Sequence, residues 1–285
     1  MNPRHYEVRD LLAFYLDSGV DAVLGEEPID RLADDPSPGG TVAAAPARTE
    51  SAQRSEASPS SQRRTAPPSP SRTTANASAP MIGPEAAVMA AREAAKSAKT
   101  LDELRALLEN FQGCPLRATA TQLVFSDGNP QSRIMFVGEA PGYEEDIKGL
   151  PFVGRSGKLL DLMLAAIGLD RSKAYIANVV PWRPPGNRTP TPQETAICLP
   201  FIHRQIELAD PDILVCLGGP AAQTLLNVKD GITRIRGRWF PYDTGTREIR
   251  AIATLHPAYL LRQPLQKRLS WRDFLAIKKA LAQGA

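Results

Sequence analysis

From about residue 120 onward, short apolar runs alternate with longer segments whose apolar residues recur every three or four positions. Runs of the first kind are typical of buried strands, and segments of the second kind are typical of helices. The pattern predicts four strand–helix pairs: 134–137 with 159–167, 175–180 with 193–208, 213–217 with 221–226, and 250–255 with 269–281. Repeated β–α units of this kind predict a three-layer α/β/α sandwich with a short, mainly parallel central sheet.

Three further segments have helical periodicity and precede the strand–helix pairs. Residues 84–96 and 101–111 are predicted helices, and Thr100 followed by Glu103 is a capping box for the second of them. Residues 6–25 form a predicted amphipathic helix, with apolar residues at Val8, Leu11, Leu12, Tyr15, Leu16 and Val20.

Between these regions, residues 36–80 consist mostly of Ser, Pro, Ala, Thr and Arg and contain almost no large apolar side chain. Such a segment cannot bury enough apolar surface to offset its ordering entropy, so we expect it to be a disordered linker. The predicted organisation is an N-terminal helical segment at 1–35, the linker at 36–80 and a catalytic domain at 81–285. The N-terminal helix either docks on the core or binds a partner protein, and the sequence favours neither reading.

The charge of the chain is unevenly placed. Residues 1–35 hold nine acidic and three basic residues, whereas residues 81–285 hold 26 basic and 20 acidic residues. A mildly basic domain permits a phosphate-bearing partner without requiring one. The three cysteines, without a signal peptide, indicate a reducing compartment, and no apolar run approaches the roughly 20 residues that span a bilayer. We therefore expect a cytoplasmic protein that does not enter membranes.

Candidate chemistry lies in loops that follow the predicted strands. Glu139 follows the first strand, Asn178 lies at the end of the second, and His256 follows the last, while Phe152 lies in a Pro/Gly turn after the first loop. Right-handed crossovers bring the carboxyl ends of parallel strands to one edge of a sheet, where α/β domains bind ligands. These four residues are therefore expected to converge.

The set of residues suits recognition of a flat polar ring. Phe152 can stack on such a ring, Asn178 can pair with its edge, and His256 can donate to an oxygen that gains negative charge. The sequence contains no GxxxxGK[ST] phosphate-binding loop, no GxGxxG and no G-x-S-x-G nucleophile turn, and its three histidines lack metal-ligand spacing.

Six motifs in order now carry a resemblance: GEAPG at 138–142, Glu145-Asp146, PFVG at 151–154, Asn178, RPPGNR at 183–188 and HPAYLLR at 256–262. From about residue 110 to 281, the chain resembles the uracil-DNA glycosylase superfamily, nearest its type 4 branch. The resemblance implies an enzyme that flips deoxyuridine out of DNA and hydrolyses its N-glycosidic bond, which starts base-excision repair.

The resemblance also implies roles for residues. Catalysis is assigned to His256, Glu139 and Asn178, with His256 stabilising charge on uracil O2 and Asn178 reading the O4/N3 edge. Phe152 would stack on uracil, and Glu145 would crowd its C5 edge and exclude thymine. Ala140 and Gly142 complete the expected uracil site. The expected DNA contacts are Gly154, Ser156, Arg188, Leu260, Leu261 and Arg262, of which the last three would brace the gap left by the flipped base.

The chain departs from the family pattern in two places. Ala140 stands where the fastest branch of the superfamily has an aspartate that positions water, so water would be held by Glu139, by loop carbonyls or by substrate phosphates. Type 4 members also carry four cysteines around a [4Fe–4S] cluster. Here Cys114 and Cys198 match two of them, but Phe111 and Trp182 replace the others. Because two thiolates do not hold such a cluster, we expect no cofactor.

Two other functions remain open at this stage. The chain is either a glycosylase, or a protein that binds uracil-containing DNA with little catalysis, or a glycosylase for another deaminated base such as hypoxanthine. In each case the expected partner is DNA, and we expect a monomer associated with the nucleoid.

Overall fold

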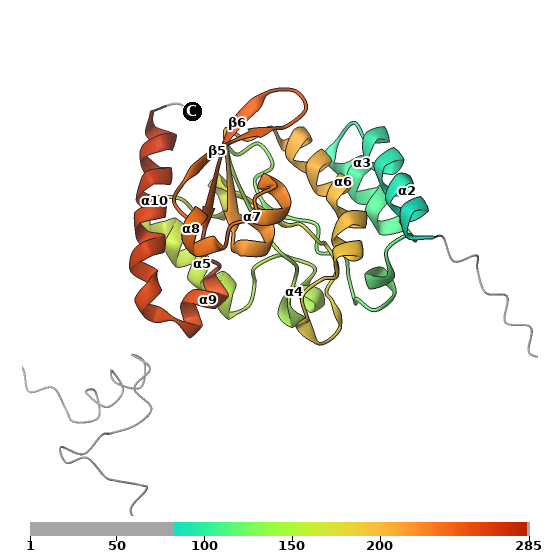
Figure 1. Ribbon diagram of the computed structural model, residues 1–285, viewed down its shortest axis with the longest axis horizontal. Coiled ribbons are helices and arrows are strands. Elements are labelled where there is room, and N and C mark those ends of the chain that lie inside the picture. The colour runs from blue at the N-terminus through green and yellow to red at the C-terminus, as the bar shows by residue number, and fades with distance from the viewer. Residues whose placement is uncertain (1–82, 284–285) are drawn as a thin grey trace, which may run out of the picture. The chain divides into compact units, whose positions relative to one another are not determined.

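A six-stranded sheet in the order β1-β3-β2-β4-β6-β5 forms the centre of the domain in the computed structural model, which describes residues 83–283 (Figure 1). The predicted helix at 6–25 and the predicted linker at 36–80 lie outside the described residues. The four inner strands are parallel: β3 (Tyr175–Asn178), β2 (Ile134–Gly138), β4 (Ile213–Leu217) and β6 (Glu248–Thr254). The edge strands β1 (Asp127–Gly128) and β5 (Trp239–Asp243) are antiparallel to their neighbours.

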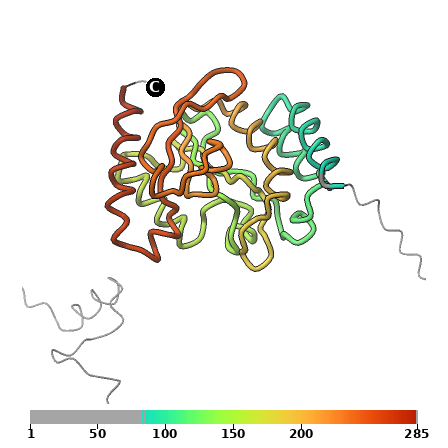
Figure 2. The backbone as a smooth tube through the Cα atoms, viewed as in Figure 1, coloured from blue at the N-terminus to red at the C-terminus, as the bar shows by residue number. Residues whose placement is uncertain are grey.

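Helices cover both faces of the sheet (Figures 1 and 2). One face packs against α5 (Arg155–Ala166) and α10 (Lys267–Ala282). The other packs against α6 (Pro192–Ala209) and α7 (Gly219–Leu226), and the paired helices α2 (Pro84–Ser97) and α3 (Leu101–Asn110) lie outside α6. Three short helices lie in the connections: α4 (Tyr143–Lys148), α8 (Ile232–Ile235) and α9 (Pro257–Arg262).

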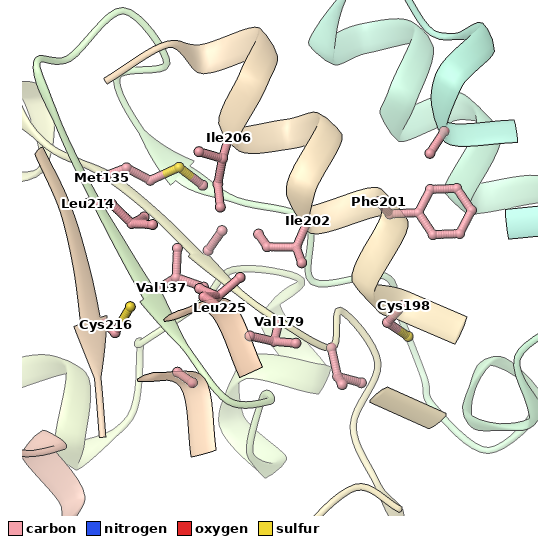
Figure 3. Packing of buried hydrophobic residues seen from close by; sticks show 14 of the residues in the cluster. Met135, Val137, Val179, Cys198, Phe201, Ile202, Ile206, Leu214, Cys216 and Leu225 are labelled. Carbon is pink, nitrogen blue, oxygen red and sulfur yellow. The ribbon is translucent and has the colours of Figure 1, made fainter. Parts of the chain in front are cut away.

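Side chains of the inner strands alternate between two cores, as the pleat of a strand requires. Met135 and Val137 face the α6 side, whereas Ile134 and Phe136 face α5 and α10. Figure 3 shows that α6 packs on two sides: Ile202 and Ile206 point toward the sheet, and Phe201 points toward the N-terminal helices α2 and α3. Strands buried on both faces explain why these runs are continuously apolar in the sequence.

The predicted α/β class and the four predicted strand–helix pairs are confirmed, with boundaries that shift by a few residues. The antiparallel edge strands were not predicted. The capping box of α3 is only half formed. Thr100 accepts a hydrogen bond from Glu103 N at 3.1 Å, but the Glu103 carboxylate accepts from Lys99 N at 2.6 Å instead of from Thr100 N.

The parallel strands end at one edge of the sheet. Gly138 lies opposite Asn178 in the β2–β3 register, and Leu217 lies opposite Thr254 in the β4–β6 register. The loops after β2, β3, β4 and β6 therefore start next to one another, which creates the setting for a site.

Candidate active site

A cavity of about 610 Å³ opens at this edge of the sheet. The four loop residues that were expected to converge, Glu139, Phe152, Asn178 and His256, all line it. Most of the other residues that the sequence analysis assigned to uracil or DNA also line the cavity, namely Ala140, Gly142, Glu145, Ser156, Arg188 and Arg262.

Gly138, the last residue of β2, allows two functional side chains to approach each other. A Cβ atom at this position would lie 2.5 Å from Asn178 Oδ1 and 2.6 Å from Phe152 Cζ. Any larger residue would therefore push the amide or the ring out of place, which explains why position 138 is a glycine.

Asn178 is buried, with 4% of its surface exposed, at the end of β3. Its Oδ1 atom has no hydrogen-bond partner among the described residues. A buried amide oxygen without a partner costs about 1–3 kcal/mol, and such groups in native proteins need an explanation. A ligand that donates a hydrogen bond inside the cavity would satisfy this oxygen.

Phe152 is also buried, at 4% exposure, and its ring centroid lies 5.5 Å from that of His256 with 30° between the planes. Its backbone has φ +54°, in the left-handed region that residues with side chains seldom adopt. Strain of this kind persists where the surrounding structure over-determines a conformation, and it is concentrated at functional sites.

His256 begins helix α9 as its N-cap, and its Nδ1 atom accepts a hydrogen bond from Ala258 N at 3.1 Å. Because Nδ1 is the acceptor, Nε2 carries the proton of the neutral ring. Burial, with a smaller contribution from Arg262, lowers the pKa of His256 from 6.5 to about 4, although Glu145 opposes the shift. The imidazole is therefore a neutral Nε2–H donor at physiological pH.

The end of β6, which leads to His256, is held by contacts with α10. The Thr254 hydroxyl donates to Asp273 on α10 at 2.7 Å, and Arg236 donates to the same carboxylate through Nε at 3.0 Å. Asp273 is 2% exposed, so this ion pair is buried. These contacts fix the end of β6 and, with it, the start of the histidine loop.

Glu139 is half-buried in the first loop, and burial raises the pKa of its carboxyl group. Its Oε1 atom has no hydrogen-bond partner within residues 83–283. The neighbouring Ala140 contributes only a methyl group. Glu139 is therefore the titratable group in this loop that can hold a water molecule.

Glu145 joins the first and second loops. Its Oε2 atom accepts from Gly142 N at 3.1 Å, and its Oε1 atom accepts from Val153 N at 3.0 Å and from Gly154 N at 2.9 Å. Gly154 is also the N-cap of α5, so the carboxylate lies at the positive end of a helix dipole. Ser156 follows in the first turn of α5 and faces the cavity.

Two of the expected DNA contacts, Leu260 and Arg188, are packed or paired within the protein. Leu260 is only 1% exposed, because it lies on the inner side of the α9 helix, and its role in bracing DNA stays a prediction. Leu261, one position further around the helix, is 36% exposed. Arg188 pairs with Glu194 through two hydrogen bonds of 2.8 and 2.7 Å, and Glu194 also caps α6 at Thr191.

The site includes residues that sequence reasoning missed. The Gly218-Gly219-Pro220 turn after β4 lines the cavity, and Gly218 has φ +99° with the position of a Cβ atom 3.1 Å from His256 Cβ. This turn follows an apolar strand just as the Glu139 loop does, which was the available signal. Tyr259 and Asn187 also line the cavity.

Comparison with known proteins identifies the family of this chain. A family model for the Uracil DNA glycosylase superfamily matches residues 125–276, and the chain belongs to this superfamily. The type-4 uracil-DNA glycosylase of Archaeoglobus fulgidus is 42% identical over 183 residues, which are 63% of this chain and 92% of that protein. The Thermotoga maritima type-4 enzyme is 47% identical over 150 residues, which are 52% of this chain and 77% of that protein.

The residues present do not fit the iron–sulfur cluster of the type 4 pattern. Cys114 and Cys198 lie with their Sγ atoms 3.9 Å apart, and both are buried. Phe111 stacks edge-to-face on Phe201 at 5.0 Å, and Trp182 is 2% exposed in the same apolar cluster (Figure 3 labels Cys198 and Phe201). Residues 83–283 contain no group of three or more His, Cys, Asp or Glu side chains that could hold a metal ion.

We expect the purified protein to lack bound iron and the visible absorbance of an iron–sulfur cluster, because the chain supplies two of the four thiolates that a cluster requires. Iron and sulfide analysis of protein produced under anaerobic conditions, with a four-cysteine type-4 enzyme produced in parallel, provides the measurement. Stoichiometric iron in this protein would contradict the prediction.

Proposed function

We propose that this protein removes uracil from DNA by drawing a flipped deoxyuridine into the cavity and hydrolysing its N-glycosidic bond. The observation that carries the proposal is the buried Asn178 amide, whose Oδ1 atom has no partner among the described residues and which lies beside an aromatic ring and a neutral histidine. Membership of the uracil-DNA glycosylase superfamily supports the same conclusion.

Recognition of uracil depends on Asn178 and Phe152. The Asn178 Oδ1 atom accepts from the N3–H of the base, and its amide nitrogen donates to O4, since the amide carries both functions side by side. The ring of Phe152 stacks on the face of the base. Glu145 lines the cavity with its carboxylate held by three backbone amides, and we propose that it occupies the space that a C5 methyl group would need.

Departure of the base depends on His256. Cleavage produces an oxocarbenium-like sugar and a uracil anion, so a donor placed at uracil O2 lowers the barrier. The neutral Nε2–H of His256 supplies this donor, and because the pKa is lowered to about 4, the ring stays neutral at physiological pH. The Ala258 amide holds the required tautomer.

We assign the attacking water to Glu139. Its Oε1 atom is buried without a partner among residues 83–283, and Ala140 offers no second carboxylate. On the DNA side, Leu261 and Arg262 at the end of α9 would brace the gap left by the base. Ser156 and Gly154 at the start of α5 would contact a phosphate, as helix N-termini do.

We extend the proposal to the oligomeric state and the cellular compartment of the protein. We also propose that the protein acts as a monomer. No helix in the described part of the chain is long and apolar enough to cross a membrane. Cys114, Cys198 and Cys216 are unpaired, which suits the reducing cytoplasm in which nucleoid DNA is repaired.

Ala140 favours a second candidate, a protein that binds uracil-containing DNA with little catalysis. With only a methyl group at this position, the first loop lacks one group that could position the attacking water. Such a protein would still bind uracil-containing DNA but would hydrolyse little of it.

Incubation with a labelled oligonucleotide that carries a single uracil, followed by alkali, tests the proposal. We expect strand cleavage at uracil, but none at thymine or hypoxanthine in the same sequence. Tight binding without cleavage would favour the second candidate, and cleavage at hypoxanthine alone would identify a different base specificity.

Replacement of His256 by Ala should lower the rate of uracil release by about 10²–10³, the scale on which loss of one anion-stabilising donor acts. The matched control is His203→Ala on α6, where the ring contacts the Tyr242 hydroxyl at 2.7 Å, outside the cavity. This control should keep its rate. A His256→Ala protein that is as fast as the wild type would remove His256 from the mechanism.

A further inference from the structure

Arg171 lies behind the loop that carries Phe152 and does not itself line the cavity. It belongs to a short 3-10 helix, Arg171–Lys173, that follows α5 along the chain, and its side chain is 25% exposed. Nothing in the sequence singles out this arginine, because it stands between polar residues in a segment that looks like an ordinary surface turn.

The guanidinium group of Arg171 contacts two consecutive carbonyl groups of the Phe152 loop. Its Nη1 atom donates to Pro151 O at 3.1 Å, and its Nη2 atom donates to Phe152 O. Two carboxylates hold the same group from other directions: Asp127 on β1, and Asp161 on α5 at 2.8 Å. The arginine therefore connects β1 and α5 to the backbone of two consecutive residues, Pro151 and Phe152.

The Phe152 backbone needs such support. Its φ of +54° is in the left-handed region, and the residue is buried. On one side, Gly157 of α5 lies so close that any side chain at that position would overlap the Phe152 carbonyl group. The carbonyl is thus fixed between the helix backbone and the Arg171 guanidinium, which together define where Cα of Phe152 lies.

We propose that Arg171 is a positioning residue for the base-stacking ring of Phe152. This inference rests on the proposed function for its effect on uracil, but its structural part stands without it. The ring lies only two torsions from the fixed backbone, and it already contacts Gly138 and lies against His256. A displacement of the backbone by about 1 Å would therefore move the stacking surface relative to Asn178 and His256, and errors of this size are costly in catalysis.

Lysine cannot replace arginine in this arrangement. The planar guanidinium presents five N–H donors in a fixed fork and serves four acceptors here, whereas an ammonium group is a compact charge with three donors. Arg171→Lys therefore keeps the charge and removes the bridge between the carbonyl groups and the carboxylates.

The chain contains a matched control in Arg247. This residue also contacts two carboxylates, Asp210 at 2.7 Å and Asp212 at 3.2 Å. It donates to two consecutive carbonyl groups as well, those of Asp210 and Pro211, at 3.0 and 3.1 Å. Because Asp212 directly precedes β4, this cluster lies at the amino end of the strands, away from the cavity. Arg247→Lys removes the same chemistry without touching the Phe152 loop.

The experiment measures kcat and KM for uracil release with Arg171→Lys and Arg247→Lys, each in the wild-type protein and in a Phe152→Ala protein. We expect Arg171→Lys to lower kcat about tenfold or more through lost alignment, with a small change in KM for DNA, and Arg247→Lys to have no effect. In the Phe152→Ala background, Arg171→Lys should cause little further loss. Equal losses in both backgrounds would overturn the proposal.

A second measurement does not depend on activity. Fluorophenylalanine placed at position 152 reports the ring environment by ¹⁹F NMR, and we expect Arg171→Lys, but not Arg247→Lys, to shift or broaden its signal. An unchanged signal would overturn the proposal. If Arg171→Lys does not fold, Asp161→Asn, which loosens one anchor of the guanidinium, should give a smaller shift, and no shift would have the same consequence. If the wild-type protein releases no uracil, the proposed function is wrong, whereas the positioning of Phe152 by Arg171 is still tested by the ¹⁹F signal.

Discussion

The carboxylate of Glu145 holds together the two loops from which the pocket is built. It accepts hydrogen bonds from the backbone amides of Gly142, Val153 and Gly154, so one side chain joins the loop after β2 to the start of α5. Hydrogen bonds to an ionised acceptor are stronger than neutral ones, and Glu145 is only 8% exposed. The loop that contains Glu139 and the loop that contains Phe152 are therefore joined by a residue that the family resemblance presented only as a contact for the base.

The sheet supplies the remaining constraint. Its register places Gly138 opposite Asn178, and the missing side chain at Gly138 leaves room for the amide and the Phe152 ring. Unfavourable features are concentrated at this point: a left-handed backbone at Phe152, a buried amide oxygen without a partner in the described chain, and a half-buried histidine whose pKa is lowered to about 4. Proteins tolerate such features where function requires them and stabilise them elsewhere. Here the stabilising contacts come from Glu145, Arg171 and the Asp273 ion pair.

Much of the fold could be predicted from the sequence because the inner strands are continuous apolar runs with polar ends. The edge strand β5 escaped prediction because only one of its five residues is fully buried and it contains Pro241. Prediction brought Glu139, Phe152, Asn178 and His256 together correctly, since parallel strands share one edge. The inward orientation of Leu260 depends on helix rotation, the Arg188–Glu194 pair depends on the local turn before α6, and the Arg171 bridge depends on contacts between separate segments. Periodicity encodes none of these.

The central claim, that Glu145 holds the two loops together, is tested most directly by amide hydrogen exchange in a Glu145→Gln protein. The amide side chain has one acceptor oxygen and brings an NH₂ group against backbone donors. We predict that the amides of Gly142, Val153 and Gly154 exchange faster together, while strand amides and a Glu144→Gln control behave as in the wild type. Unchanged protection of these three amides in Glu145→Gln would contradict the account.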